Sequence, residues 1–401
     1  MRPKISIGFN NGVIGAVQPL NTGCFALVAS AVAVENGFQL ETPYQVKNLK
    51  DIANLKLSDT IDNHRLYKAI TEFYSEAGEG SELWIYGMPK DKKVSEWFSP
   101  IEGVAPVENL LNAAKGKIRG VFTINDTSVS VEVQNGMDGD VLVAAEKAHT
   151  LFKKYTAEKY APFFTILEAY AFDGNKVNLP NLKEQKNYNS VGVLIGDTET
   201  RTGTTASKGS AVGVLAGRLA AHSVKVNPGK VKNGALSAQK LFINDTPVEQ
   251  FDTEDLYDKG FITFTTHQNR AGYFTMDASM LCPVDDDYHY ITNRRTINEA
   301  FRHTYDALLD FLMDEIPANN DGTIHAIYAK TIESAVERKI STTMGEDLNQ
   351  NPENLKDTGV KCFVNPHQNI VSTSKIEVSV GIRPYGTARW IEVLLGFELE
   401  N

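Results

Sequence analysis

Cysteine is scarce in this chain, and its few cysteines form no recognisable pattern. Only three occur among 401 residues, at Cys24, Cys282 and Cys362. They are odd in number, far apart and never in a C-x-x-C spacing, so the sequence indicates neither a disulfide scaffold nor a zinc site. We expect buried thiols in a reducing compartment.

Long apolar runs are also missing. The longest, such as residues 191–195, are far too short to cross a bilayer. The first residues, Met1 to Ser6, lack the apolar stretch of a secretory signal peptide. We therefore expect no membrane partner, and a protein that stays in the cytoplasm or leaves it by another route such as cell lysis.

Clusters of positive charge are absent as well. The formal net charge is −10, and no run of Lys and Arg offers a phosphate-binding surface, so nucleic acid is not an expected partner. The hydrophobic fraction is 42%, which is ordinary for a globular protein with a sizeable core. The length allows one large domain or two to three ordinary ones.

Up to about residue 244, segments with strand periodicity alternate with segments with helix periodicity. This alternation predicts an α/β layer with a mostly parallel sheet flanked by helices. An apolar segment at 24–34 comes first, and Val129, Val131 and Val133 predict an added strand or hairpin. The expected strands are 83–88, 118–124, 163–167 and 191–195, and the expected helices are 66–77, 107–114, 141–155 and 211–221.

The pattern then changes to a C-terminal α+β part with extended terminal strands. Expected here are antiparallel strands at 261–266 and 272–280, helices at 294–313 and 324–340, and closing strands at 376–382 and 391–399. The second helix would bury Ile324, Ile327 and Ile332. The predicted domains are an N-terminal arm (1–20), an α/β core (21–260), a C-terminal domain (261–387) and a C-terminal arm strand (388–401).

One loop imitates a phosphate-binding site. Residues 203–210 are rich in Gly and Thr and lie between a predicted strand and a predicted helix, as phosphate-binding loops do. The motif fails because it needs a glycine before its lysine, whereas Lys208 precedes Gly209. Gly209, Gly213 and Gly217 are spaced by four, so we interpret them as a helix face that packs closely on a sheet or a neighbouring subunit.

No other pattern predicts catalysis or metal binding. There is no G-x-S-x-G and no H-E-x-x-H, so a hydrolase is not indicated. Asp285, Asp286 and Asp287 with His289 are better read as a solvated loop, since three consecutive carboxylates point in different directions. Asp347, Asn349 and Asn351 imitate a calcium loop, but Pro352 stands where its glycine belongs. We predict no enzyme, no cofactor and no metal.

Two further features remain open to two interpretations. Arg294 and Arg295 begin a predicted helix, where positive charge opposes the helix dipole, so they are either solvated or form salt bridges within or between subunits. The last strand and the strand-like N-terminal arm either complete their own domain or pair with neighbouring molecules by β-augmentation.

The order and spacing of several stretches resemble contractile-tail sheath proteins. The resemblance is to a compact sheath-like family of phages and phage-derived injection systems of Bacteroidetes-type bacteria. This chain is shorter than many phage sheaths, so the large outward-facing domains of those proteins are expected to be missing. The stretches are 7–20, 73–85 (FYSEAGEGSELWI), 213–221 with the Asn227-Pro228 loop, 288–301 with Arg294-Arg295, and 360–399.

The resemblance implies a structural sheath subunit that polymerises around an inner tube and drives it outward by contraction. Its partners would be further copies of itself, the inner tail tube protein, and baseplate and terminator proteins. A second sheath chain, as in two-component systems, stays open. It would be found in the bacterial cytoplasm when assembled, and in a virion tail or a released contractile particle. The alternatives are a tail-terminator or baseplate protein of the same fold, and less so an α/β hydrolase or a nucleotide-binding enzyme.

The same resemblance points to two sets of site residues. The subunit–subunit interface would be formed by Ile5, Ile7, Phe9, Arg389, Ile391, Val393, Leu395 and Phe397. The surface that faces the inner tube would lie on the helix at 324–340 and include Lys330, Glu333, Glu337 and Arg338.

Overall fold

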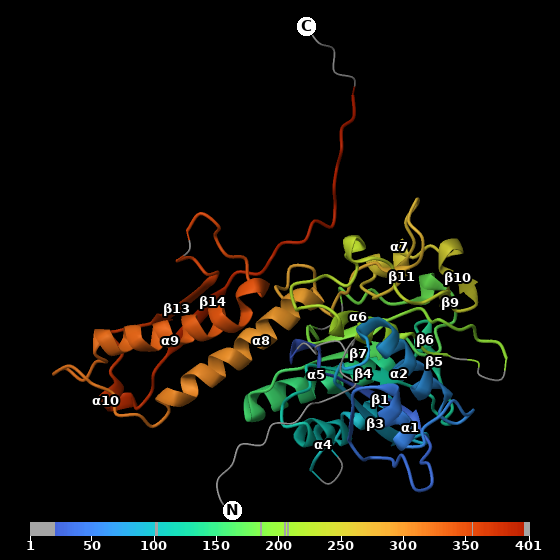
Figure 1. Cartoon of the computed structure of the whole chain (residues 1–401), viewed down its shortest axis with the longest axis horizontal. Helices are drawn as coiled ribbons and strands as arrows, with labels where there is room; N and C mark the ends of the chain where they lie inside the picture. The colour runs from blue at the N-terminus through green and yellow to red at the C-terminus, as the bar shows by residue number, and fades with distance from the viewer. Residues whose placement is uncertain are drawn as a thin grey trace, which may run out of the picture. The chain divides into compact units, whose positions relative to one another are not determined.

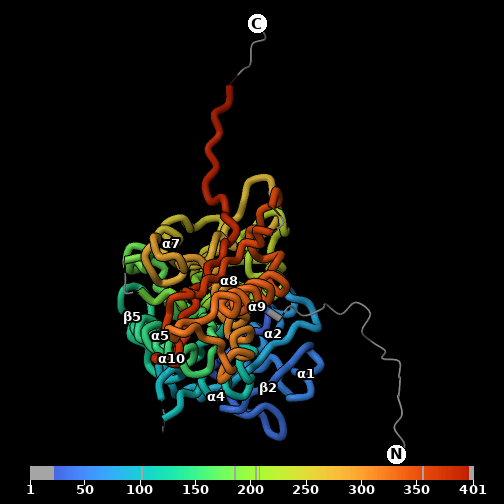
Figure 2. The backbone as a smooth tube through the Cα atoms, turned by 90° about the vertical axis from the view of Figure 1, so that its left-hand side faces the viewer, coloured from blue at the N-terminus to red at the C-terminus, as the bar shows by residue number. Residues whose placement is uncertain are grey.

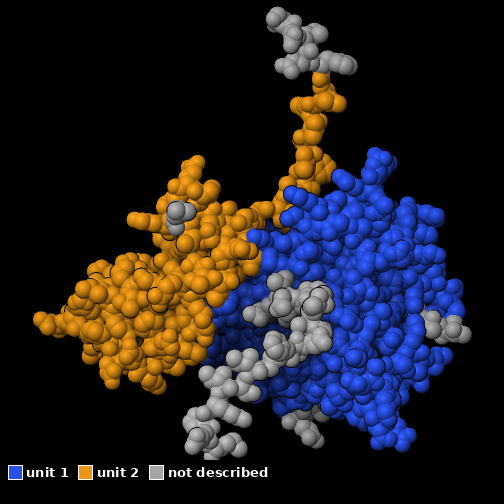
Figure 3. Space-filling view, in the orientation of Figure 1, with its two compact units in different colours: residues 1–305 blue, residues 306–401 orange. Residues whose placement is uncertain are grey.

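A computed structural model describes residues 21–396 of the chain, apart from 101–102, 185–186, 204–205, 207 and 355. The chain forms two compact units, which divide after Tyr305 (Figure 3). This division lies inside helix α8 (Ile291–Leu308), whereas the sequence prediction divided the two large domains after residue 260. No helix in the described part is both long and apolar enough to span a membrane.

A six-stranded sheet forms the centre of unit 1 (Figure 1). Its order is β2-β3-β1-β4-β7-β8, and all neighbours are parallel except that β2 runs antiparallel to β3. Most of these strand residues are buried, as expected for a sheet covered on both faces. The strands are β1 (Phe25–Ala31), β2 (Tyr44–Val46), β3 (Leu83–Pro89), β4 (Gly120–Ile124), β7 (Phe164–Glu168) and β8 (Val191–Leu194).

Helices cover both faces of this sheet. Helices α2 (His64–Ala77) and α6 (Val212–Ala220) pack on each other and on β1, and α5 (Asp140–Lys159) packs on β7 and β8 with α3 (Val94–Trp97) against it. The right-handed crossover rule places the two pairs on opposite faces, because β1 to β3 and β4 to β7 run in opposite directions across the sheet. The shorter helices are α1 (Leu49–Asn54), α4 (Pro106–Ala113) and α7 (Glu254–Asp258). The mostly parallel, helix-flanked sheet predicted from the sequence is therefore confirmed.

The predicted smaller strands are much shorter in the structure. The valine alternation at 129–133 yields only the hairpin β5 (Val133–Gln134) and β6 (Met137–Asp138), and a similar pair is β9 (Phe242–Ile243) with β10 (Thr246–Pro247). The two long strands expected at 261–280 reduce to β11 (Phe264–Thr265) and β12 (Phe274–Thr275). The hairpin is short because part of the first segment pairs elsewhere: Ile262 donates its N–H to Val193 of β8.

The glycines of α6 allow it to approach α2 closely. A Cβ built on Gly213 would lie 2.3 Å from the backbone oxygen of Ala69, and one on Gly217 would lie 2.5 Å from that of Phe73. Any larger residue would force the two helices apart. The prediction of close packing is confirmed for Gly213 and Gly217, but the expected partner was wrong: it is helix α2 of the same chain, not a sheet or a neighbouring subunit, and Gly209 precedes α6.

Unit 2 is built on one helix and one hairpin. Helix α9 (Ala326–Met344) packs on β13 (Val360–Val364), which pairs antiparallel with β14 (Val378–Ile382), and α10 (Ile370–Thr373) lies between the strands in sequence. Ile324, Ala329, Ile332 and Val364 form its buried cluster. The prediction that Ile327 is buried was wrong: this side chain is 73% exposed, because it lies on the face of α9 opposite the buried residues Ile332 and Val336.

All three cysteines are buried, as expected. Cys24 begins the segment that enters β1, Cys282 lies in the last loop before α8, and Cys362 lies in β13. Burial raises the pKa of Cys24 and of Cys282 to about 12, and the pKa of Cys362 to about 11.

Candidate assembly surface

The C-terminal segment 384–396 follows β14 and carries no regular secondary structure. In Figures 1 and 2 it extends away from α9 and from the β13–β14 hairpin. Its large apolar side chains lie in solvent: Trp390, Ile391, Val393 and Leu395 are 81%, 77%, 75% and 96% exposed. Leaving several such side chains in water is costly, so this segment has the character of a surface that another molecule covers.

This segment contains half of the predicted interface residues. Arg389, Ile391, Val393 and Leu395 all lie on it and are exposed. The strand predicted at 391–399 is not formed over 391–396, because a strand exists only when its N–H and C=O groups find a partner strand. The other four predicted interface residues, Ile5, Ile7, Phe9 and Phe397, lie outside the described residues.

The residues predicted to face the tube divide into two pairs on α9. Lys330 and Arg338 are exposed. Glu333 is only 5% exposed; it accepts the N–H of Val364 at 2.9 Å and forms an ion pair with Lys330 at 2.5 Å. Glu337 accepts the N–H of Cys362 at 2.8 Å. The two glutamates are therefore engaged with β13. Of these four residues, Arg338 and Lys330 keep their charged groups exposed to solvent, although the Lys330 ammonium is also ion-paired with Glu333.

The electrostatics of Glu333 fit this engagement. Burial alone would raise its pKa, but the hydrogen bonds from the Lys330 ammonium and the Val364 N–H outweigh burial and lower the pKa below its usual range. The carboxylate is therefore charged at neutral pH and is a strong acceptor for a backbone N–H.

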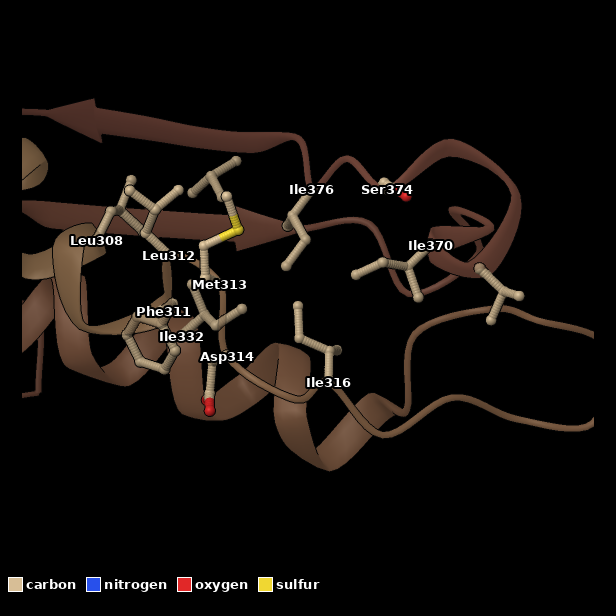
Figure 4. Close-up of a pocket in the computed structure, with 12 residues that line it drawn as sticks. Leu308, Phe311, Leu312, Met313, Asp314, Ile316, Ile332, Ile370, Ser374 and Ile376 are labelled. Atoms are coloured by element: carbon tan, nitrogen blue, oxygen red, sulfur yellow. The ribbon is translucent and has the colours of Figure 1, made fainter.

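Unit 2 also contains an apolar cavity of about 570 Å³ (Figure 4). Side chains converge on it from the end of α8 and the loop after it, from α9, and from α10 through the start of β14. Among its lining residues, Leu312 and Met313 are 69% and 95% exposed, so its rim is also apolar. The lining includes Leu308, Phe311, Leu312, Met313, Ile316, Ile332, Ile370, Val371, Ile376 and Val378.

In unit 1, internal ion pairs occupy the carboxyl edge of the sheet, where open α/β folds bind ligands. Here the Arg65 guanidinium of α2 pairs with the Glu168 carboxylate at the end of β7, and both are buried. Glu168 also accepts the N–H of Asn125 at 2.6 Å and of Ser210 at 2.9 Å. The N–H of Ser210, which a phosphate-binding loop would offer to its ligand, is thus used by an internal carboxylate.

More ion pairs along α2 close the same edge. Lys68 pairs with Asp197, just after β8, and His64 lies 2.5 Å from Asp59 and 2.9 Å from Glu199. Burial alone would lower the pKa of Arg65, but the Glu168 and Asp197 carboxylates raise it above its usual range. These pairs fix α2 and the loop after β8 to the sheet.

The aspartates before α8 form a structural turn. Asp286 accepts bonds from Asn187 at 2.6 Å and from the Tyr288 N–H at 2.7 Å, while Asp285 and Asp287 are exposed. Within the described ranges, no group of three or more His, Cys, Asp or Glu side chains could hold a metal ion.

The two arginines at the start of α8 are not solvated, contrary to one of the two interpretations of the sequence. Arg294 and Arg295 are 5% and 3% exposed. Arg294 donates to the backbone oxygen of Asn189 at 3.0 Å, and Arg295 donates to that of Leu219, at the end of α6, at 2.9 Å. Further along α8, Arg302 donates to the backbone oxygen of Ile118 at 3.1 Å. These bonds hold the helix against loops before β4 and β8 and after α6.

Two family profiles match this chain. The DUF2586 N-terminal domain matches residues 2–279, and the DUF2586 C-terminal domain matches residues 287–401. The chain therefore belongs to the DUF2586 family. A comparison with curated proteins finds no match.

Solved structures share the fold over the whole chain. A chain of the cryo-EM structure of the anti-feeding prophage (AFP) baseplate has a TM-score of 0.60 and 12% identity, covering 100% of this chain and 99% of that one. A chain of the PVC sheath complex, an extracellular contractile injection system in its contracted state, has a TM-score of 0.59 and 15% identity, covering 99% and 98%. This chain therefore shares its fold with chains from structures of contractile injection systems, which agrees with the resemblance seen in the sequence.

Sequence reasoning missed the role of Glu333 and Glu337. The sequence prediction placed both off the apolar stripe of the helix, as solvent-facing charges, whereas Glu333 is buried beside Ile332 and Val336. A signal was present: Glu333 and Glu337 are four residues apart on one helix face, and the strand 360–364 has two alternate amides at a similar spacing. Only the packing of that strand on α9 shows that the two sets meet.

Proposed function

We propose that this chain is a structural sheath subunit of a contractile tail or injection system. It polymerises around an inner tube and drives the tube outward when the array contracts. The observation that carries this proposal is the exposed apolar segment 389–396 on a chain whose fold matches, end to end, a chain of a contractile sheath complex. The narrower assignment to systems of Bacteroidetes-type bacteria rests on sequence resemblance alone.

Strand addition supplies the links of this polymer. Residues 389–396 pair with the sheet of a neighbouring subunit, and the N-terminal residues Ile5, Ile7 and Phe9 do the same in another direction. Backbone hydrogen bonds carry the link, so it survives rotation of whole subunits. Burial of the apolar side chains adds about 1.5–3 kcal/mol for each one that becomes fully covered.

The tube contact lies on α9 and involves Lys330 and Arg338. Such a contact has to break during contraction, and exposed ion pairs suit this because each contributes only about 0–1 kcal/mol. The partners of the subunit are further copies of itself, the tube protein, and the baseplate and terminator proteins at the ends of the array. No catalytic step is assigned to it.

A second candidate is a baseplate or tail-terminator component of the same fold. The full-length likeness to a chain of the AFP baseplate structure favours it. The two roles differ in how copies assemble. A sheath continues to grow along an axis, whereas a baseplate or terminator forms a single closed ring.

Negative-stain electron microscopy of the purified chain separates the two, at high protein concentration and with tube protein present. Tubes of variable length support the sheath role. Rings of one fixed size, which do not stack with added tube protein, support the baseplate or terminator role. A strictly monomeric protein under both conditions would overturn the proposal.

A further inference from the structure

A buried histidine lies outside the surfaces described above. His149 belongs to α5 and packs against the loop that precedes β8. Its Nδ1 lies 2.8 Å from the Ser190 hydroxyl, and its ring stacks on Phe152 with 5.8 Å between the ring centroids. The Tyr188 ring, from the same loop as Ser190, lies 5.5 Å away. Tyr188 in turn donates its N–H to the backbone oxygen of Leu281 at 2.6 Å, so the loop also joins the segment before α8.

The first turn of α8 reaches the same place through Arg294. Its guanidinium lies over the Phe152 ring, 5.3 Å from the centroid, where a cation is attracted to the aromatic face. It also donates to the side-chain oxygen of Asn189 at 2.7 Å and to the backbone oxygen of Asn189 at 3.0 Å. His149 and Arg294 therefore share the Phe152 ring. We call the packing of α5, the loop 187–190 and the first turn of α8 around this ring the α8 junction.

The charges that act on His149 are mostly positive. Burial, Lys153 and Arg294 lower the pKa of His149 from 6.5 to about 4, and the Asp286 carboxylate acts in the opposite direction. The ring is therefore neutral at neutral pH. Further titratable groups at the α8 junction include Glu146 beside the Tyr188 hydroxyl, Tyr288 under Arg294, the exposed Asp285 and Asp287, the Cys282 thiol, and His289, whose Nδ1 lies 2.9 Å from the backbone oxygen of Cys282.

Charge, and not hydrogen bonding, opposes protonation of His149. The Ser190 hydroxyl can donate to a neutral ring nitrogen or accept from a protonated one, so its bond survives in both states. A protonated ring, however, is a second buried cation beside Arg294, and burial of an uncompensated charge is costly. The cost disappears when the α8 junction opens, because water then solvates both cations. Acid therefore favours an open junction.

We propose that His149 is an acid-sensitive latch on the start of α8. While its ring is neutral, α5, the loop 187–190 and the first turn of α8 stay packed together. When the ring takes up a proton, it and Arg294 repel each other and the α8 junction opens to water. The two units divide inside α8, so the latch lies at the beginning of the helix through which the chain passes from unit 1 to unit 2. This inference does not depend on the proposed function.

The direction of the pH effect follows from the lowered pKa. Packing favours the neutral ring, so the contribution of His149 to the closed junction is fully present above pH 6.5 and is lost as pH falls through about 4. If the ring regains its usual pKa in the open junction, the ratio of open to closed junction rises about 20-fold between about pH 7 and about pH 5.

Amide hydrogen exchange followed by mass spectrometry measures this opening in the full chain. Exchange is compared at about pH 7 and about pH 5, after correction for the intrinsic effect of pH on amide exchange. We expect the protection of residues 187–194 and 288–297 to fall about 20-fold. Strands β1 and β4, at the centre of the sheet, should keep their protection because only the junction opens.

Two matched variants assign the effect to one ring. His149→Phe keeps an aromatic ring against Phe152 but cannot take up a proton, so it should abolish the fall in protection. His267→Phe replaces an exposed histidine of unit 1 and should leave the fall unchanged. An equal fall in His149→Phe and in the unmodified chain would overturn the proposal and assign the effect to His289, another buried histidine at the junction. An unmodified chain without the fall would overturn it as well.

The ring itself gives a second test, which holds even if His149→Phe fails to fold. Exchange of the imidazole C2 hydrogen depends on protonation of the ring, so mass spectrometry of the unmodified chain gives the pKa of His149. We expect a pKa well below 6.5, and a pKa at or above 6.5 would contradict the latch. None of these results bears on polymerisation, so the proposed function stands or falls by its own experiment.

Discussion

Arg65 of helix α2 and Glu168 of strand β7 form an ion pair whose side chains are 6% and 1% exposed. The pair stands where an open α/β sheet would otherwise bind a ligand, and it joins the helix layer to the sheet. Replacing Arg65 with Met leaves the Glu168 carboxylate buried without its cation. We expect this to lower the free energy of unfolding by about 3–5 kcal/mol, measured by urea titration.

The double variant Arg65→Met with Glu168→Met provides the control for that experiment. It removes both charges and keeps the volume apolar, so it should recover much of the lost stability. An Arg65→Met variant as stable as the unmodified chain would show that the pair does not hold the two layers together.

Helix α6 should not tolerate a methyl group at Gly213. Alanine favours helices, but here its Cβ would lie 2.3 Å from the backbone oxygen of Ala69 on α2. Overpacking of this kind costs about 1–3 kcal/mol, more than the helix preference returns. Gly386→Ala is the control, because nothing lies within 4 Å of a Cβ there. Thermal unfolding of both variants checks this, and an equal melting temperature would contradict the close contact.

His64 should make stability depend on pH. Burial alone would lower its pKa, but its bonds to Asp59 and Glu199 raise the pKa above the usual value of 6.5. A raised folded-state pKa means that the protonated form is favoured by folding. Its contribution is fully present below about pH 6.5 and is lost as pH rises through the folded-state pKa.

The His64→Gln variant isolates this effect. Stability of the unmodified chain should fall relative to the variant as pH rises above 6.5, and an NMR titration of the His64 ring should show a midpoint above 6.5. A midpoint at or below that value would rule out the charged interaction with the two carboxylates.

The tube contact is tested by reversing charge on α9. Arg338→Glu combined with Lys330→Gln should weaken attachment to the tube and leave the fold intact, because both side chains are exposed. Lys330 is neutralised instead of reversed so that Glu333 does not face a second carboxylate. Lys361→Glu, an exposed charge reversal on β13, is the control. Normal tube-bound assembly by the α9 variant, measured by co-sedimentation, would place the contact elsewhere.

Removing residues from Ala388 onward should give a folded, soluble monomer that cannot polymerise. The described residues of this segment are exposed, so its loss removes little buried surface from the chain's own core. Circular dichroism and light scattering measure the result. An unfolded or aggregated product would show instead that the segment belongs to its own domain.

The sequence predicted the elements whose periodicity reflects a single local environment. The alternating strands and the stripe of α2 follow directly from burial on one or two faces. The segment 391–396 shows the limit of this reasoning. Its apolar residues alternate as in a strand with one buried face, but in the single chain it forms no strand and is exposed. Ile327 shows another limit: the buried stripe of α9 runs through Ala329, Ile332 and Val336, and Ile327 lies on the opposite face of the helix.

The candidate site was predictable only in part, because its polar contacts depend on tertiary structure. The spacing of Glu333 and Glu337 is compatible with two alternate amides of a strand, but it does not show that Val364, thirty-one residues later, supplies one of them. Arg294 and Arg295 were recognised as unusual from their position, but their acceptors are backbone oxygens, which carry no sequence signal. A carboxylate partner must be an Asp or a Glu, which the sequence shows. A carbonyl partner can be any residue, because every residue has a backbone carbonyl.

The burial of all three thiols gives this chain a practical property. With pKa values of about 11 to 12, Cys24, Cys282 and Cys362 contain almost no thiolate at neutral pH, and thiolate is the form that reacts with maleimides. A single cysteine introduced at Glu392 would therefore be labelled selectively, without removing the native ones. A fluorophore at that position would report, in real time, the moment at which the segment passes from water into contact with another subunit.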